Sequence, residues 1–264
     1  MIIALLILVE LLGLSVGSFL NVVIYRLPRD LSVVRPPSSC PSCHERISAR
    51  DNIPILSWVL LRGRCRYCSE PISLRYAFIE DLTANLFLVA AWRIGPHLPL
   101  ISYLVFITGL VPLCVIDFQF MLLPRRLVYL TYVGMIPGFA LDAVLHHSDV
   151  HRLVVALGAS LSWFLLFGLI NLVSPRHLGF GDVRLAGVLG LATGWFGWPV
   201  PVVALYTGAL LGIAGWALIH WRRGDTSEGE SRLTIPFGPY LALGALVAIV
   251  IHPTITTFFA QHHL

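Results

Sequence analysis

Long apolar runs constrain the fold of this 264-residue chain more than any other feature. A run of about 20 apolar residues can cross a bilayer as a helix, whereas barrel strands need only about ten. Eight runs can be separated, of which the sixth is short and rich in glycine: 2–25, 77–94, 98–116, 127–145, 153–173, 183–197, 200–221 and 236–259. The sequence therefore predicts an all-α polytopic membrane protein with about eight transmembrane helices.

The composition excludes most other classes of protein. Apolar residues make up 57% of the chain and charged residues 12%, about half of what soluble domains carry. One soluble core of this size could not bury so much apolar surface, so we exclude a water-soluble enzyme, a disordered chain and a disulfide-rich scaffold. The first run lacks the basic start and the small-residue cleavage site of a secretory signal, so we expect it to stay as a helix.

The arginines fix an expected orientation. The chain has 18 Arg and no Lys, with a net charge of +4, and nine of the arginines lie in the polar stretch 26–75. If this stretch is cytoplasmic, alternation of the spans leaves only Arg93 and Arg152 outside, as the positive-inside rule requires. We therefore predict that both termini lie outside and that the large loop lies in the cytoplasm. Because topology explains the basic residues, we do not predict nucleic-acid binding.

Four cysteines in the polar stretch form two pairs. Cys40 and Cys43 make one C-x2-C turn, and Cys65 and Cys68 make another after 21 intervening residues. Two such turns can supply the four thiolates of a closed tetrahedral site, which suits structural Zn²⁺ and a reducing compartment. An iron–sulfur centre and four unrelated reduced cysteines are the alternatives.

Two aspartates stand at the edges of apolar runs. Asp117 ends the third run and Asp182 opens the sixth, with two complete spans between them, so both are expected at the cytoplasmic membrane face. A pair of carboxylates can share one proton, so that one activates water while the other protonates a scissile amide, as in aspartic proteases. Gly179 and Gly181 would let the backbone turn sharply and a substrate approach. Alternatively, Asp182 only caps a helix and Asp117 pairs with an arginine.

Several further motifs can be read along the chain: 17–28, the two cysteine turns, 52–58, 72–76 with Glu80, 116–117, 179–182 and 235–239. Together they resemble one family, the prepilin peptidases, which are bacterial inner-membrane aspartic proteases of the GxGD type. The resemblance implies that type IV prepilins or type II secretion pseudopilins are cleaved at the cytoplasmic face, with Asp117 and Asp182 as the catalytic pair. It also implies that S-adenosylmethionine supplies a methyl group to the new N-terminus, because members with the cysteine loop often carry this second activity.

The expected organisation follows from these assignments. Residues 1–25 would be the first span, 26–75 the zinc loop associated with methylation, and 76–264 the peptidase domain.

The chain departs from the family pattern at Arg125, where the family has Asp, at Arg184, where it has Lys, and at Ala77, where it has Pro. The alternatives are a peptidase without methylation and a non-catalytic assembly factor with a zinc loop. Membrane lipids are expected partners, while the particular substrate and the oligomeric state stay open.

Overall fold

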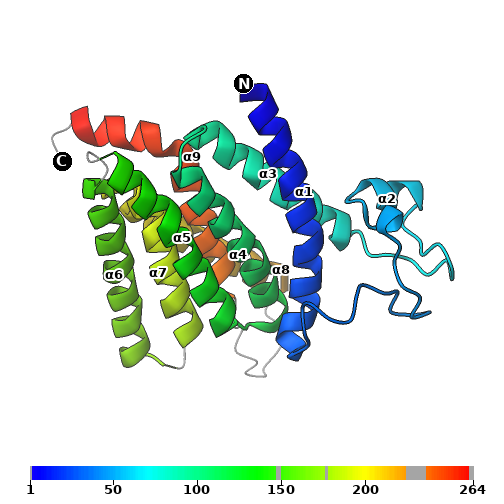
Figure 1. The fold of residues 1–264 in the computed structure, drawn as a ribbon. Coiled ribbons are helices and arrows are strands. Elements are labelled where there is room, and N and C mark those ends of the chain that lie inside the picture. The colour runs from blue at the N-terminus through cyan, green and yellow to red at the C-terminus, as the bar shows by residue number, and fades with distance from the viewer. Residues whose placement is uncertain (1, 147–149, 176–177, 224–235, 262–264) are drawn as a thin grey trace. The chain divides into compact units, whose positions relative to one another are not determined.

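The described part of the chain is helical. The computed structural model describes residues 2–146, 150–175, 178–223 and 236–261. Within these ranges it contains helices and two isolated bridge pairs but no strand, which confirms the predicted all-α class (Figure 1). Arg176 and Arg232, which enter the charge pattern, and the first residue of the 235–239 motif lie outside the described residues.

Each of the eight apolar runs forms a helix, and two short 3-10 helices and one short α-helix lie in the polar stretch. The helices are α1 (Ile2–Arg26), η1 (Leu27–Arg29), η2 (Ala49–Asn52), α2 (Leu56–Leu60), α3 (Arg75–Ile94), α4 (Pro99–Phe120), α5 (Arg125–Leu145), α6 (Val150–Val173), α7 (Phe180–Gly194), α8 (Pro199–Arg223) and α9 (Gly238–Gln261).

Six helices of the described residues are long and apolar enough to cross a membrane. They are α1 together with η1, α4, α5, α6, α8 and α9. Helix α3 is long enough but carries Glu80 and Asp81 between arginines at its ends, and α7 has only 15 residues. The structure thus supports a multi-pass membrane protein, while the predicted number of eight spans is not confirmed.

The chain divides into two compact units, Met1–Ile116 and Asp117–Leu264. In the first unit, α1 packs closely against α3 at two glycines spaced four residues apart. A Cβ at Gly13 would lie 2.7 Å from the Cα of Ala84, and one at Gly17 would lie 2.7 Å from the Cα of Glu80. Small residues at this spacing let two membrane helices approach backbone to backbone. The division predicted at residues 25 and 75 stays a prediction.

The polar stretch forms a lobe that is tied to α3 (Figure 1). The carboxylate of Glu80 in α3 accepts the backbone N–H of Ile55 at 2.7 Å. The side-chain amide of Asn21 in α1 donates to the carbonyl of Tyr76 in α3 at 3.1 Å and joins the two helices. Inside the lobe, the indole N–H of Trp58 donates to the carbonyl of Ile72. A loop with little apolar core therefore gains its order from polar contacts made at defined points.

Helix α7 is the centre of the second unit. Eleven of its fifteen residues are buried, and α5, α6, α8 and α9 all contact it. A Cβ at Gly190 would lie 2.7 Å from the carbonyl oxygen of Ala159, and one at Gly194 would lie 2.7 Å from the Cα of Ala156, so both glycines allow α6 to pack tightly. The glycine-rich composition of the sixth run thus reflects burial on all sides.

Candidate functional site

The four paired cysteines meet in the first unit. Their Sγ atoms all lie within 4.8 Å of one another. The sulfur of Cys40 is 3.8 Å from that of Cys68, and the sulfur of Cys43 is 4.0 Å from that of Cys65. Each of these two contacts joins one C-x2-C turn to the other, so the turns face each other as a four-ligand site requires.

The two turns have the same construction. In each, the residue after the second cysteine, His44 or Ser69, donates its backbone N–H to the carbonyl of the first cysteine at 3.0 Å. Both residues have a positive φ, 61° and 60° respectively. The chain therefore folds back after each pair, and the thiols of one turn point to the same side.

The sulfur geometry fits a tetrahedral metal ion. With metal–sulfur bonds of about 2.3 Å, a tetrahedron of thiolates has sulfur–sulfur edges of about 3.8 Å. The observed separations of 3.8 and 4.0 Å are close to this edge, whereas a disulfide would need about 2.05 Å. The cluster could therefore bind a metal ion, and because all four positions are filled by protein ligands, the site would be structural.

An ion pair braces the cluster from outside. The guanidinium of Arg66, which lies between Cys65 and Cys68, donates through Nε to both carboxylate oxygens of Asp51, at 3.0 and 2.9 Å. Ser48 also donates to this carboxylate at 2.9 Å. The hydrogen bonds from Arg66 lower the pKa of Asp51 to about 2, so the pair stays charged at physiological pH.

The two predicted aspartates belong to the second unit. Asp117 stands near the end of α4 and is 5% exposed, while Asp182 stands in the first turn of α7. Helices α5 and α6, both candidate spans, lie between them in the chain. The charge of Asp117 acts on Asp182, so the two carboxyl groups are near enough to repel each other. Among the described residues, neither aspartate forms an ion pair with an arginine.

Gly238 places the start of α9 against Asp117. A Cβ at this position would lie 2.7 Å from Oδ2 of Asp117 and 3.2 Å from the side chain of Leu185. This Oδ2 atom is buried and has no hydrogen-bond partner among the described residues. Sequence reasoning did not assign Gly238 a role; the signal was its place in the 235–239 motif, directly after a polar segment.

The glycines before Asp182 act differently from what the sequence suggested. Gly179 has φ −72° and ψ 146°, and Gly181 is not among the residues with a positive φ, so neither makes a turn that other residues cannot. Gly181 is instead required by a close approach, because its Cβ would lie 2.9 Å from the Cβ of Leu123. The missing side chain lets the start of α7 pack against the segment that follows α4.

Comparison with known protein families gives matches to two segments of this chain, one with the four cysteines and one with the two aspartates. The model of the bacterial peptidase A24 N-terminal domain matches residues 11–94, and that of the type IV leader peptidase family matches residues 104–217. A prepilin leader peptidase/N-methyltransferase of Aeromonas hydrophila is 35% identical over 282 residues, covering 97% of this chain and 94% of the relative. The chain belongs to the type IV leader peptidase family. This confirms the family expected from the motifs.

Other members of the family agree. The prepilin leader peptidase/N-methyltransferase of Pectobacterium carotovorum is 34% identical, with 91% of each chain covered. That of Myxococcus xanthus is 43% identical over 70% of this chain and 55% of the relative. The predicted enzyme class, a peptidase combined with an N-methyltransferase, is confirmed by these names. The four cysteines fall in the first matched segment and both aspartates in the second. No solved structure matches this chain.

Proposed function

We propose that this protein removes the leader peptides of type IV prepilins or type II secretion pseudopilins at the cytoplasmic face of the bacterial inner membrane. We propose further that it methylates the new N-terminal residue of the product. The observation that carries the first part is a pair of carboxyl groups, Asp117 and Asp182, that lie in one unit and act on each other electrostatically. Neither forms an ion pair with an arginine of the described residues.

The chemistry of peptide hydrolysis follows from this pair. Two neighbouring carboxyl groups hold one proton more readily than two negative charges, because the second ionisation places like charges together. The ionised member removes a proton from water as the oxygen attacks the scissile carbonyl carbon. The protonated member donates its proton to the carbonyl oxygen, which gives a tetrahedral intermediate. As the intermediate collapses, the carboxyl group that took the proton from water passes it to the leaving nitrogen, and the other carboxylate recovers its proton from the hydroxyl. The C–N bond then breaks and releases the leader and the new amine. Gly238 and Gly181 would keep this region closely packed around the carboxyl groups.

The proposed topology has eight spans, with α3 and α7 crossing the membrane in addition to the six candidate helices. Charged groups inside a membrane are tolerated where they face protein, and Glu80 is bound by a backbone N–H. The short α7 is surrounded by four other helices, so its length need not match the lipid thickness. Both termini would lie outside, and the cysteine lobe and both aspartates would face the cytoplasm.

The proposed cofactors are one structural Zn²⁺ and S-adenosylmethionine. The four cysteines would hold the zinc, which would order the lobe without taking part in chemistry, because no coordination position is open. S-adenosylmethionine would supply the methyl group, and its binding residues remain unassigned. The two alternatives are a peptidase that does not methylate and a zinc-loop assembly factor without catalysis. Transfer of a labelled methyl group to a processed substrate separates the first from our proposal.

Replacement of either aspartate tests the peptidase assignment. Asp117→Asn and Asp182→Asn should each lower leader cleavage by about 10³-fold or more, since the amide can neither hold the negative charge nor donate the same proton. Asp142→Asn is a matched control: this buried aspartate of α5 carries an i,i+4 contact with His146 and is not part of the pair. Cleavage of a prepilin by the purified variants is the measurement. Substantial cleavage by either Asp117→Asn or Asp182→Asn would refute the assignment, most clearly if Asp142→Asn lost cleavage instead.

A further inference from the structure

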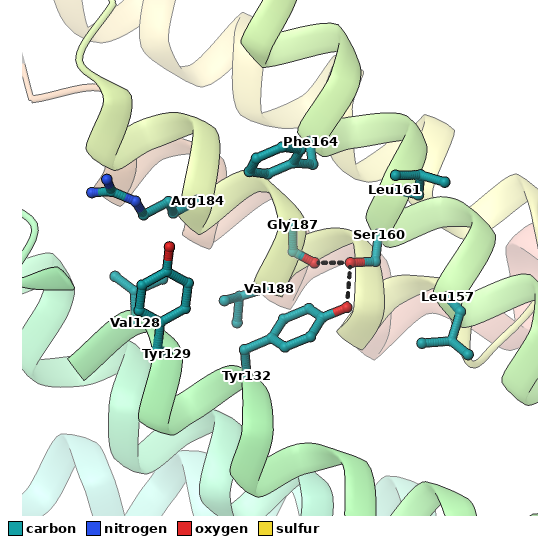
Figure 2. A pocket seen from close by; sticks show the side chains of 10 residues that line it. All are labelled: Val128, Tyr129, Tyr132, Leu157, Ser160, Leu161, Phe164, Arg184, Gly187 and Val188. Carbon is teal, nitrogen blue, oxygen red and sulfur yellow. Dashed lines mark hydrogen bonds between the residues drawn. The ribbon is translucent and has the colours of Figure 1, made fainter. Parts of the chain in front are cut away.

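A hollow of about 220 Å³ lies between α5, α6 and α7, entirely within the second unit (Figure 2). Its walls are apolar, with Val128 from α5, Leu157, Leu161 and Phe164 from α6, and Val188 from α7. Leu157 and Leu161 of α6 are 42% and 59% exposed and Tyr129 of α5 is 52% exposed, so the hollow opens on the outer surface of two helices that can span a membrane. An apolar ligand could therefore enter it from the lipid.

One end of the hollow carries a positive charge. The guanidinium carbon of Arg184 lies 4.5 Å from the ring centre of Phe180 and 5.9 Å from that of Tyr129. The aromatic rings hold the side chain in place, but no acidic residue pairs with it among the described residues, and its buried Nε has no hydrogen-bond partner there. Asp182 is two positions away on the same helix, and residues at this spacing do not face each other.

Two further polar groups of the hollow, the hydroxyls of Ser160 and Tyr132, are satisfied within the protein. The hydroxyl of Ser160 lies 2.8 Å from the carbonyl oxygen of Gly187 and 3.1 Å from the hydroxyl of Tyr132. Figure 2 shows this pair of hydrogen bonds between the Arg184 end and the Leu157 end of the hollow. At one end, the hollow thus presents the guanidinium of Arg184, which pairs with no acid among the described residues, together with the hydroxyl of Tyr129. The rest of the hollow is apolar, apart from hydroxyls that already have partners.

These properties fit an amphiphile with a negative head. We propose that the hollow binds an anionic phospholipid, with its phosphate at Arg184 and part of one acyl chain along Leu157, Leu161 and Phe164. Arg184 lies near the start of α7, so the phosphate would sit near the membrane surface while the chain runs toward the interior. Basic pockets between membrane helices are suited to such head groups. A cationic ligand would be repelled by Arg184, so charge favours an anionic head group.

Lipid-binding measurements on the full-length protein test this assignment. Native mass spectrometry would compare binding of phosphatidylglycerol and phosphatidylcholine with identical acyl chains, with glycerol 3-phosphate as the soluble counterpart of the charged head. The intact protein should prefer phosphatidylglycerol, and Arg184→Gln should lower this preference about five-fold. Arg126→Gln is the matched control, because Arg126 is exposed at the start of α5 and does not line the hollow.

Each outcome bears on the proposal. Arg184→Lys keeps the charge and should retain most of the preference for phosphatidylglycerol. Thermal melting checks that both variants are folded. If Arg184→Gln does not fold, Arg184→Lys together with competition by glycerol 3-phosphate tests the proposal. An unchanged preference in a folded Arg184→Gln, or an equal loss in Arg126→Gln, would overturn the site. Displacement of phosphatidylglycerol by equimolar glycerol 3-phosphate would show that a free phosphate, and not a lipid, is the ligand.

Discussion

Gly238 illustrates how much of the candidate active site depends on single residues that carry no chemistry. A glycine is needed at this position because an added Cβ would lie only 2.7 Å from Oδ2 of Asp117. A contact this short forces the helix start or the carboxylate to move. Because catalytic groups must be placed to within a fraction of an ångström, we regard Gly238 as a positioning residue for Asp117.

We expect Gly238→Ala to lower leader cleavage by about 100-fold, since a displacement near 1 Å can cost that much. The variant should remain folded, because the change adds one methyl group at a helix end. Gly158→Ala is the matched control: it lies inside α6, and nothing comes within 4 Å of its added Cβ. It should cleave normally and be slightly more stable, as alanine favours a helix over glycine. Normal cleavage by folded Gly238→Ala would show that Asp117 does not depend on this contact.

At the same scale, the sequence identified the aspartates but not what surrounds them. Asp117 and Asp182 could be found because an acid at the edge of an apolar run is costly and therefore conspicuous. The roles of Gly181 and Gly238 could not be predicted, since these glycines leave space for Leu123 and Asp117, and such close approaches arise only when distant segments meet. The expected sharp turn is seen at neither Gly179 nor Gly181, because neither has a positive φ, and at Gly181 the glycine is required by packing against Leu123.

At the scale of elements, the apolar runs predicted the helices closely, because one local property, a long run of apolar residues, favours both burial in lipid and formation of a helix. The apolar pattern did not explain the features of two helices, α3 and α7. The charges of α3 are accommodated by specific partners, such as the N–H of Ile55 bound by Glu80. The run 183–197 became Phe180–Gly194, and its glycines serve contact with α6, which run length does not reveal.

The cysteine lobe is the element whose stability should depend most on a ligand. We expect Cys40→Ser or Cys65→Ser to lower the zinc content from about one ion per chain to near zero, because three thiolates on a small loop bind the ion much more weakly than four. Hydrogen exchange should then become faster across residues 36–70. Cys114→Ser in α4 is the matched control and should keep its zinc, since this cysteine is not part of the cluster.

Elemental analysis and hydrogen exchange of the purified variants provide the measurement. Iron in place of zinc in the unaltered protein would favour the iron–sulfur alternative, and absence of any stoichiometric metal would favour four unrelated thiols. Unchanged hydrogen exchange after zinc loss would mean that contacts such as Arg66 with Asp51 hold the lobe without the metal.

At the scale of the whole molecule, the two proposed activities draw on different units. All four cysteines lie in Met1–Ile116, and both aspartates lie in Asp117–Leu264. The two family models divide the chain in a similar way, at 11–94 and 104–217. Sequence patterns singled out the cysteines by the spacing of their two pairs, and the aspartates by their places at the edges of apolar runs. They could not predict how a methyl donor is bound, since no glycine-rich nucleotide loop marks its site.

This separation predicts that each activity can be lost alone. Peptide hydrolysis needs the carboxyl pair and a water molecule, whereas methyl transfer needs the amine of the product and a bound donor. We therefore expect Asp182→Asn to methylate a synthetic peptide with the mature N-terminus at close to the normal rate while cleaving prepilin about 10³-fold more slowly. Cys40→Ser, where it remains folded, should cleave prepilin but methylate poorly.

A methylation assay with labelled S-adenosylmethionine, run in lipid on the pre-cleaved peptide, measures the second activity without the first. The unaltered protein and Cys114→Ser should both methylate this peptide, which fixes the reference rate. If Asp182→Asn lost methylation as completely as cleavage, the two reactions would share the carboxyl pair. If Cys40→Ser methylated normally after losing its metal, the metal site would have no part in methyl transfer, and the link between the cysteine lobe and this activity would be refuted.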